Sequence, residues 1–134
     1  ETAALRELDS IQKTIQACRE LGIAFSLDDF GTGYSSLSYL RQLTVDELKI
    51  DQSFVRDMLV DAEDMSIING LIGLGRAFDL KVVAEGVETE AHINSLLEQG
   101  CNIMQGYCIA RPMPAEKLGQ WLKEFSDHPT WSTQ

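Results

Sequence analysis

Carboxylate side chains follow short apolar segments at three places in this sequence. They are Asp28 and Asp29 after residues 23–27, Asp51 after residues 45–50, and Glu85 and Glu88 after residues 80–84. A fourth apolar segment, residues 101–104, is followed by the amide Gln105. Carboxylates that lie close together repel one another, and a hard divalent cation relieves that repulsion. If the segments are neighbours, the sequence predicts a cation site, and two such ions would suit attack by water on a phosphodiester.

A purely structural explanation competes with this one at every segment. An Asp or Glu after a strand often does no more than cap the helix that follows. At any one segment the two explanations have equal weight. Polar groups at all four ends together favour a site.

Lys49 interrupts the second apolar segment. In a strand, Leu48 and Ile50 share one face and Lys49 points to the other. A lysine in the interior of a barrel needs an anionic partner, whereas a lysine on an edge strand would lie in water. We favour the interior position for Lys49 and keep the edge strand as the alternative.

The apolar pattern predicts the elements that must position these groups. Short apolar runs predict strands at residues 23–27, 45–50, 80–84 and 101–104, and helical spacing predicts helices at 9–21, 35–43, 62–78, 89–99 and 114–125. Strands that alternate with helices indicate an α/β fold with parallel strands and right-handed crossovers. The carboxyl ends of parallel strands share one edge of the sheet, so the polar groups are expected to meet there.

The composition limits the classes of function. With 134 residues, of which 44% are hydrophobic, the chain fits one soluble globular domain. Its 21 acidic and 11 basic residues give a net charge of −10, which argues against DNA as a partner. No apolar run approaches the roughly 20 residues of a membrane span. Three cysteines without close pairing favour free thiols in a reducing cytoplasm over a disulfide or a zinc site.

Four motifs in order resemble those of the EAL-domain cyclic-di-GMP phosphodiesterases. They are LDDFGTGYSSL at 27–37, LKID at 48–51, VAEGVE at 83–88 and QGY at 105–107. The resemblance covers nearly the whole chain. It implies a TIM-like (β/α)8 barrel that hydrolyses cyclic di-GMP to the linear dinucleotide pGpG with Mg2+ or Mn2+, using two ions, in bacterial second-messenger signalling.

The motif that names this family, Glu-Ala-Leu, is absent, as is the asparagine that follows it in the family. Both belong to the first half of the barrel, and the chain begins with Glu1 rather than Met. We therefore expect residues 1–134 to be a partial EAL domain, about the last four β/α units. A complete barrel typically takes about 250 residues.

The resemblance also implies roles for individual residues of the chain. Asp28 resembles the aspartate shared by two metals, and Asp29 resembles its neighbour on the second metal and the attacking water. Lys49 resembles the lysine that holds or polarises this water. Glu85 resembles a catalytic carboxylate that also binds metal.

Three further roles follow from the same resemblance. Gln105 resembles the site glutamine of the last strand. Glu88 resembles a glutamate that anchors the loop after Asp29, and Glu1 resembles a metal ligand that ends the fourth core strand.

Three functional hypotheses remain open on the sequence alone. The first is an active phosphodiesterase parent, with an upstream sensor or GGDEF domain, whose isolated C-terminal half is inactive because metal ligands are missing. The second is a non-catalytic cyclic-di-GMP-binding or regulatory EAL module. The third is structural: a half-barrel exposes two sheet edges and is expected to form a homodimer. The expected location of the chain is cytoplasmic. Anchoring of the parent to a membrane through other domains is compatible with this location.

Overall fold

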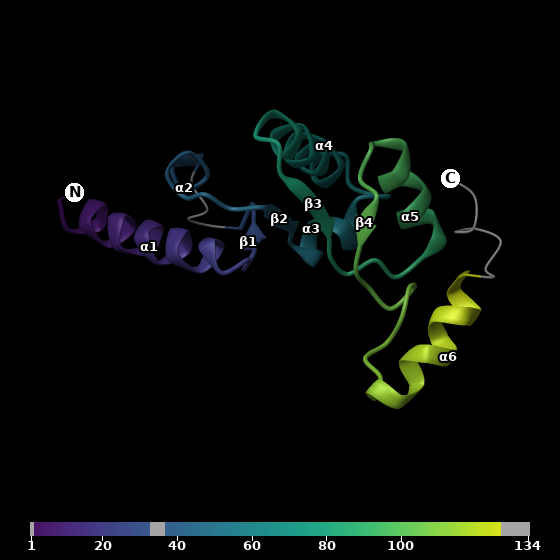
Figure 1. The fold of residues 1–134 in the computed structure, drawn as a ribbon. Coiled ribbons are helices and arrows are strands. Elements are labelled where there is room, and N and C mark those ends of the chain that lie inside the picture. Colours follow the sequence, from purple (N-terminus) through teal and green to yellow (C-terminus); the bar gives the residue numbers. More distant parts are fainter. Residues whose placement is uncertain (1, 33–36, 127–134) are drawn as a thin grey trace.

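The computed structural model describes residues 2–32 and 37–126 (Figure 1). The helices are α1 (Thr2–Glu20), α2 (Leu37–Gln42), α3 (Gln52–Asp57), α4 (Ala62–Ala77), α5 (Glu90–Glu98) and α6 (Ala115–Ser126). The strands are β1 (Ser26–Phe30), β2 (Glu47–Ile50), β3 (Lys81–Ala84) and β4 (Ile103–Met104). Each strand is followed by at least one helix, as the sequence predicts.

The four strands form one sheet in the order β1-β2-β3-β4, and every neighbouring pair is parallel. Leu48 in β2 is level with Leu27 in β1 and with Val82 in β3. This register brings the carboxyl ends of the strands to one edge. The predicted parallel α/β arrangement is therefore confirmed.

The first strand lies later in the chain than predicted. It runs over Ser26–Phe30 instead of residues 23–27, and Ile23 is 49% exposed. Its pairing with β2 skips from Leu27 to Phe30, whose side chain reaches the core. A strand can bury Phe30 in this way only by accommodating Asp28 and Asp29 in an irregularity. The two aspartates thus lie inside β1 and not beyond its end.

The core lies between the sheet and the helices that follow its strands. Leu48 and Ile50 are fully buried, while Lys49 between them is not, so the predicted alternation along β2 is confirmed. Helix α4 contributes Ile68 and Leu71 to the same core. The packing of α4 against the sheet thus fixes β2, which carries Lys49.

The remaining helices differ in how closely they match the pattern. Helices α4, α5 and α6 begin and end within two residues of the predicted bounds, whereas the short helix α3 was not predicted. Helices α1 and α6 extend from opposite ends of the molecule (Figure 1), and α6 buries none of its residues. Among the described residues, no helix has the length and apolarity that a bilayer span requires.

Candidate active site

An irregularity in β1 brings two adjacent aspartates to the same site. In a regular strand, neighbouring side chains point to opposite faces. Here Asp29 has φ 51°, in the left-handed region, and the register shifts at this point. The Asp29 carbonyl accepts hydrogen bonds from Thr32 N (3.3 Å) and Thr32 Oγ1 (2.8 Å), and Asp28 Oδ1 accepts one from Asp29 N (3.0 Å). The bulge therefore lets both carboxylates serve one cluster.

Lys49 connects two of the predicted site residues. Its Nζ lies 2.5 Å from Glu85 Oε1 and 3.2 Å from Asp28 Oδ1, and its side chain is 20% exposed. The hydrogen bond to Glu85, joined by that to Asp28, raises the pKa of Lys49 despite the opposing effect of burial. The amine is thus held as an ammonium ion. The inward position with an anionic partner is confirmed, and the edge-strand alternative is wrong, because β2 lies between β1 and β3.

Three carboxylates converge beside Lys49. One oxygen each from Asp28, Asp29 and Glu85 lies within 4.8 Å of the others. The negative charge of Asp28 is the largest cause that raises the pKa of Asp29. Carboxylate oxygens at this spacing are ligands that hard divalent cations such as Mg2+ or Mn2+ prefer. The donor set therefore fits a divalent cation.

Asp51 serves as a helix cap next to this cluster. Its Oδ1 accepts a hydrogen bond from Ser53 N (2.9 Å) at the start of α3, and one from Ser53 Oγ. These bonds lower the pKa of Asp51. Asp51 also contributes to the raised pKa of Asp29, so the two carboxylates lie close together. For Asp51 the capping explanation offered by the sequence is confirmed.

The other predicted site residues take different positions. Gln105 directly follows β4 and has an exposed side chain, and its backbone N donates to the carbonyl of Ala84 at 2.8 Å. Glu88 is exposed on the loop after β3, and part of the loop it was predicted to anchor, residues 33–36, lies outside the described residues. Glu1 also lies outside the described residues.

Gly86 and Gly106, which have no role in the predicted site, lie in the loops after β3 and β4, directly after Glu85 and Gln105. Gly86 has φ 71°, and both glycines come into close contact with a neighbouring loop. A glycine directly after a polar residue at a strand end was the available signal.

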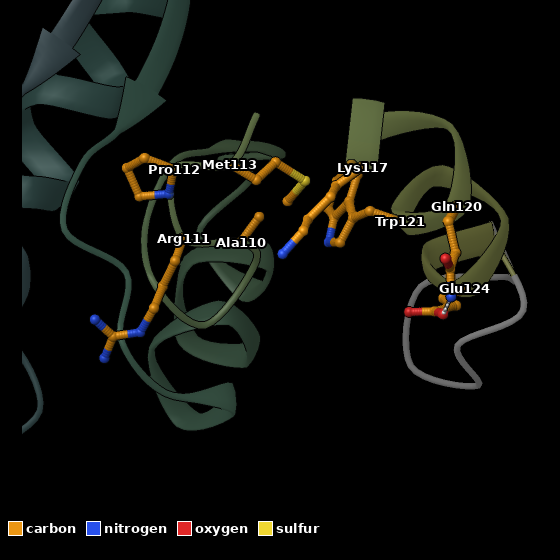
Figure 2. Close-up of a pocket in the computed structure, with 8 residues that line it drawn as sticks. All are labelled: Ala110, Arg111, Pro112, Met113, Lys117, Gln120, Trp121 and Glu124. Atoms are coloured by element: carbon orange, nitrogen blue, oxygen red, sulfur yellow. Dashed lines mark hydrogen bonds between the residues drawn. The ribbon is translucent and has the colours of Figure 1, made fainter. Parts of the chain in front are cut away.

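A separate cavity lies away from the acidic cluster. It has a volume of about 480 Å³ and lies between residues 110–113 and α6. Figure 2 shows Met113 and Trp121 projecting into the space between that loop and the helix. None of the predicted site residues lines this cavity. The chemistry predicted from the sequence therefore belongs to the carboxyl edge of the sheet.

Comparison with known proteins gives consistent matches. The family model described as EAL domain matches residues 1–112. The chain is 47% identical over 118 residues to the bifunctional diguanylate cyclase/cyclic di-GMP phosphodiesterase MucR of Pseudomonas aeruginosa, covering 88% of this chain and 17% of MucR. It is 43% identical over 125 residues to the cyclic di-GMP phosphodiesterase NbdA of the same organism, covering 93% of this chain and 16% of NbdA.

Solved structures give the same result. The MucR phosphodiesterase in complex with c-di-GMP matches with a TM-score of 0.78 and 47% identity, covering 86% of this chain and 47% of that one. The EAL domain of Mycobacterium smegmatis DcpA matches with a TM-score of 0.82 and 39% identity, covering 87% of this chain and 52% of that one. The chain thus spans about half of the solved relatives and a much smaller part of the curated ones.

Proposed function

The chain belongs to the EAL domain family, and from this membership we propose that residues 1–134 supply the C-terminal half of a cyclic-di-GMP phosphodiesterase site. The proposed fold is about the last four β/α units of a TIM-like barrel, since the parallel sheet has four strands in sequential order. The proposed reaction is hydrolysis of cyclic di-GMP to linear pGpG in bacterial signalling. The named activities of MucR and NbdA support this proposal.

One observation carries the proposal: Lys49 contacts Asp28 and Glu85, which cluster with Asp29. Asp28, Asp29 and Glu85 would hold Mg2+ or Mn2+, with two ions in the complete domain. A divalent cation held there supplies Lewis-acid activation of water and charge stabilisation at the phosphodiester. We assign Glu1 as a further ligand by its resemblance to the family.

The remaining side chains have proposed roles of binding and orientation. Lys49, kept protonated by Glu85, donates hydrogen bonds that orient the attacking water, and its charge offsets the phosphate. Glu85 limits the movement of the ammonium group through their 2.5 Å contact. Gln105 is placed to bind substrate at the end of β4, and Glu88 to anchor the loop after Asp29.

The context of the site is also proposed. MucR is named as bifunctional, and this chain covers 17% of it, so we propose that the whole protein carries an upstream sensor or GGDEF domain. We propose a cytoplasmic site, where a signalling nucleotide is available. For the chain alone we propose a homodimer through the two edges of its sheet, β1 and β4, and no efficient hydrolysis.

The test is Lys49→Ala in the whole protein. We expect pGpG formation from cyclic di-GMP to fall about 10²- to 10⁴-fold, the usual effect of losing a positioned proton-handling group. The matched control is Lys81→Ala, because Lys81 is exposed at the amino end of β3. Chromatography of the nucleotides measures turnover, and calorimetry measures binding of cyclic di-GMP.

Two outcomes would contradict the proposal in different ways. Near-normal turnover of Lys49→Ala would show that the assigned role of Lys49 is wrong. Binding of cyclic di-GMP without any hydrolysis by the unmodified whole protein, with either Mg2+ or Mn2+, would favour the non-catalytic binding module.

A further inference from the structure

The loop after β3 packs against the start of α3 and against the loop after β4, at positions where only glycine fits. A β-carbon at Gly86 would lie 2.5 Å from Cβ and 3.2 Å from Cα of Gln52, at the start of α3. A β-carbon at Gly106 would lie 2.1 Å from the carbonyl oxygen and 2.3 Å from the nitrogen of Val87. Distances below 3.0 Å are essentially never seen for real β-carbons. The loops after β3 and β4 and the start of α3 therefore approach one another more closely than side chains at Gly86 and Gly106 would allow.

Backbone hydrogen bonds join the same loops. Val87 N donates to the carbonyl of Gln105 (3.1 Å), and Cys108 N donates to the carbonyl of Val87 (3.0 Å). Glu85 N donates to the carbonyl of Ile50 at the end of β2 (3.2 Å). Val87 is fully buried between these partners. Backbone hydrogen bonds thus hold the segments that follow β2, β3 and β4 in fixed positions relative to one another.

Each of the two closely packed glycines directly follows a polar residue of the predicted site. Glu85 precedes Gly86, and Gln105 precedes Gly106. We infer that Gly86 and Gly106 are positioning residues, which set the Glu85 carboxylate against Lys49 and within reach of Asp28 and Asp29. This inference rests on the proposed function in one respect, namely that the carboxylate cluster binds a divalent cation. The contact it explains, 2.5 Å between Glu85 and Lys49, belongs to the structure itself.

An added methyl group at residue 106 would displace the neighbouring backbone far enough to affect the position of Glu85. Moving a β-carbon at residue 106 from 2.1 Å to an ordinary contact of 3.4 Å requires this atom and the Val87 carbonyl oxygen to separate by about 1.3 Å. Val87 is two residues from Glu85, and the backbone offers no flexible side chain that could yield instead. Loss of groups that orient metal ligands typically weakens metal binding 10- to 100-fold.

The test is Gly106→Ala in the 134-residue chain, with Mn2+ as the probe. The φ of Gly106 lies outside the left-handed region, so alanine adds steric conflict without backbone strain. Mn2+ affinity is measured by electron paramagnetic resonance, at a temperature where circular dichroism shows the variant folded. The matched control is Gly119→Ala in α6, where an added β-carbon meets nothing within 4 Å.

We expect the dissociation constant for Mn2+ to rise about 10- to 100-fold in Gly106→Ala and to stay within about twofold in Gly119→Ala. A folded Gly106→Ala that binds Mn2+ as tightly as the unmodified chain would overturn the inference. A purely structural role for Gly106 would lower the thermal midpoint and leave the affinity of the folded protein unchanged.

A second measurement uses the unmodified chain and does not depend on the folding of a variant. In an NMR titration with Mg2+, the amide signals of Val87 and Cys108 should shift with the same dissociation constant as the Glu85 side-chain carboxyl. Amide signals that stay fixed while the Glu85 carboxyl responds would overturn the inference.

A chain that binds neither cation would disprove the proposed cation site and not the inference about the glycines. In that case the Glu85 carboxyl resonance decides. It must differ between the unmodified chain and Gly106→Ala, or Gly86→Ala if the former does not fold, and remain unchanged in Gly119→Ala. An unchanged resonance in the glycine variant overturns the inference.

Discussion

Asp29 combines two unfavourable features, a left-handed backbone and a close like charge. A non-glycine residue at φ 51° costs roughly 1–2 kcal/mol, although Asp tolerates this region better than most residues. The charge of Asp28 raises the pKa of the Asp29 carboxyl further. Such costs persist where the surroundings fix the conformation, and they are common at functional sites. A cation held by the cluster would offset the repulsion between Asp28 and Asp29, which agrees with the proposed role, whereas the backbone cost at Asp29 would remain.

Asp46 is a carboxylate with a structural task. It accepts hydrogen bonds from Phe25 N (2.8 Å) and from Arg19 Nη1 (2.5 Å), which links α1 and the start of β1 to the chain before β2. The bond from Phe25, followed by Arg19, lowers the pKa of Asp46 below its ordinary 3.8. A depressed folded-state pKa stabilises the protein above the unfolded-state value, and the gain is lost as the pH falls through the folded-state value.

We therefore predict that Asp46→Asn reduces the free energy of unfolding at pH 7. The reduction should shrink as the pH falls from 3.8 through the lower folded-state pKa, because the wild-type carboxylate then becomes protonated too. Urea unfolding between pH 2 and pH 7 measures this difference. Asp9→Asn on the exposed surface of α1 is the control, with little effect expected. A deficit in Asp46→Asn that is constant over the whole pH range would contradict the prediction.

The contact between α4 and β3 depends on a small residue at Gly75. A β-carbon there would lie 2.1 Å from Cγ2 of Val82, whose branched side chain has few alternative rotamers. Gly73, also in α4, has nothing within 4 Å of the same position. The two glycines of one helix should therefore respond in opposite ways to alanine.

We predict that Gly75→Ala lowers the free energy of unfolding by about 1–2 kcal/mol, since overpacking outweighs the gain of up to about 1 kcal/mol in helix propensity. Gly73→Ala should raise it by up to about 1 kcal/mol. Thermal unfolding followed by circular dichroism measures both. In the double variant Gly75→Ala/Val82→Ala the clash is removed. Its loss in free energy of unfolding should therefore be smaller than the sum of the losses in the two single variants. Strict additivity would show that this contact does not limit the packing.

The elements themselves could be predicted from the sequence where one periodicity dominated. Helices α4 and α5 follow directly from apolar spacing. The bounds of β1 could not be predicted, because the bulge that buries Phe30 depends on its pairing with β2. Helix α3 could not be predicted, because its apolar residues Phe54 and Val55 are adjacent and show no helical spacing. Among the site residues, the motifs identified Lys49 and its acidic neighbours, but only the fold gives their distances.

Among the described residues, the molecule has open sheet edges and exposed apolar side chains, which a closed barrel would cover. Strands β1 and β4 end the sheet on its two sides, and α6 has half-exposed Leu118 and Leu122 with no buried residue. The number of strand–helix units could be predicted from the sequence, because each unit has its own apolar pattern. How the two edges are covered could not be predicted, since the apolar pattern of one unit does not say what lies beside its strand. Open edges of this kind favour pairing with further strands.

We predict that the isolated chain hydrolyses cyclic di-GMP at least about 100-fold more slowly than the whole protein, because in the proposed half-barrel part of the cation ligand set and one wall of the barrel would be supplied by the rest of the protein. Turnover is measured with Mg2+ and with Mn2+ over a wide range of chain concentration. Sedimentation of the same samples should give about twice the monomer mass of 14.9 kDa. Pairing of the edges would bury apolar surface, but a second copy brings the same residues and not the missing ones. Robust turnover that rises with dimerisation would show instead that a second copy completes the site, and robust turnover by the monomer would show that the missing ligands are dispensable.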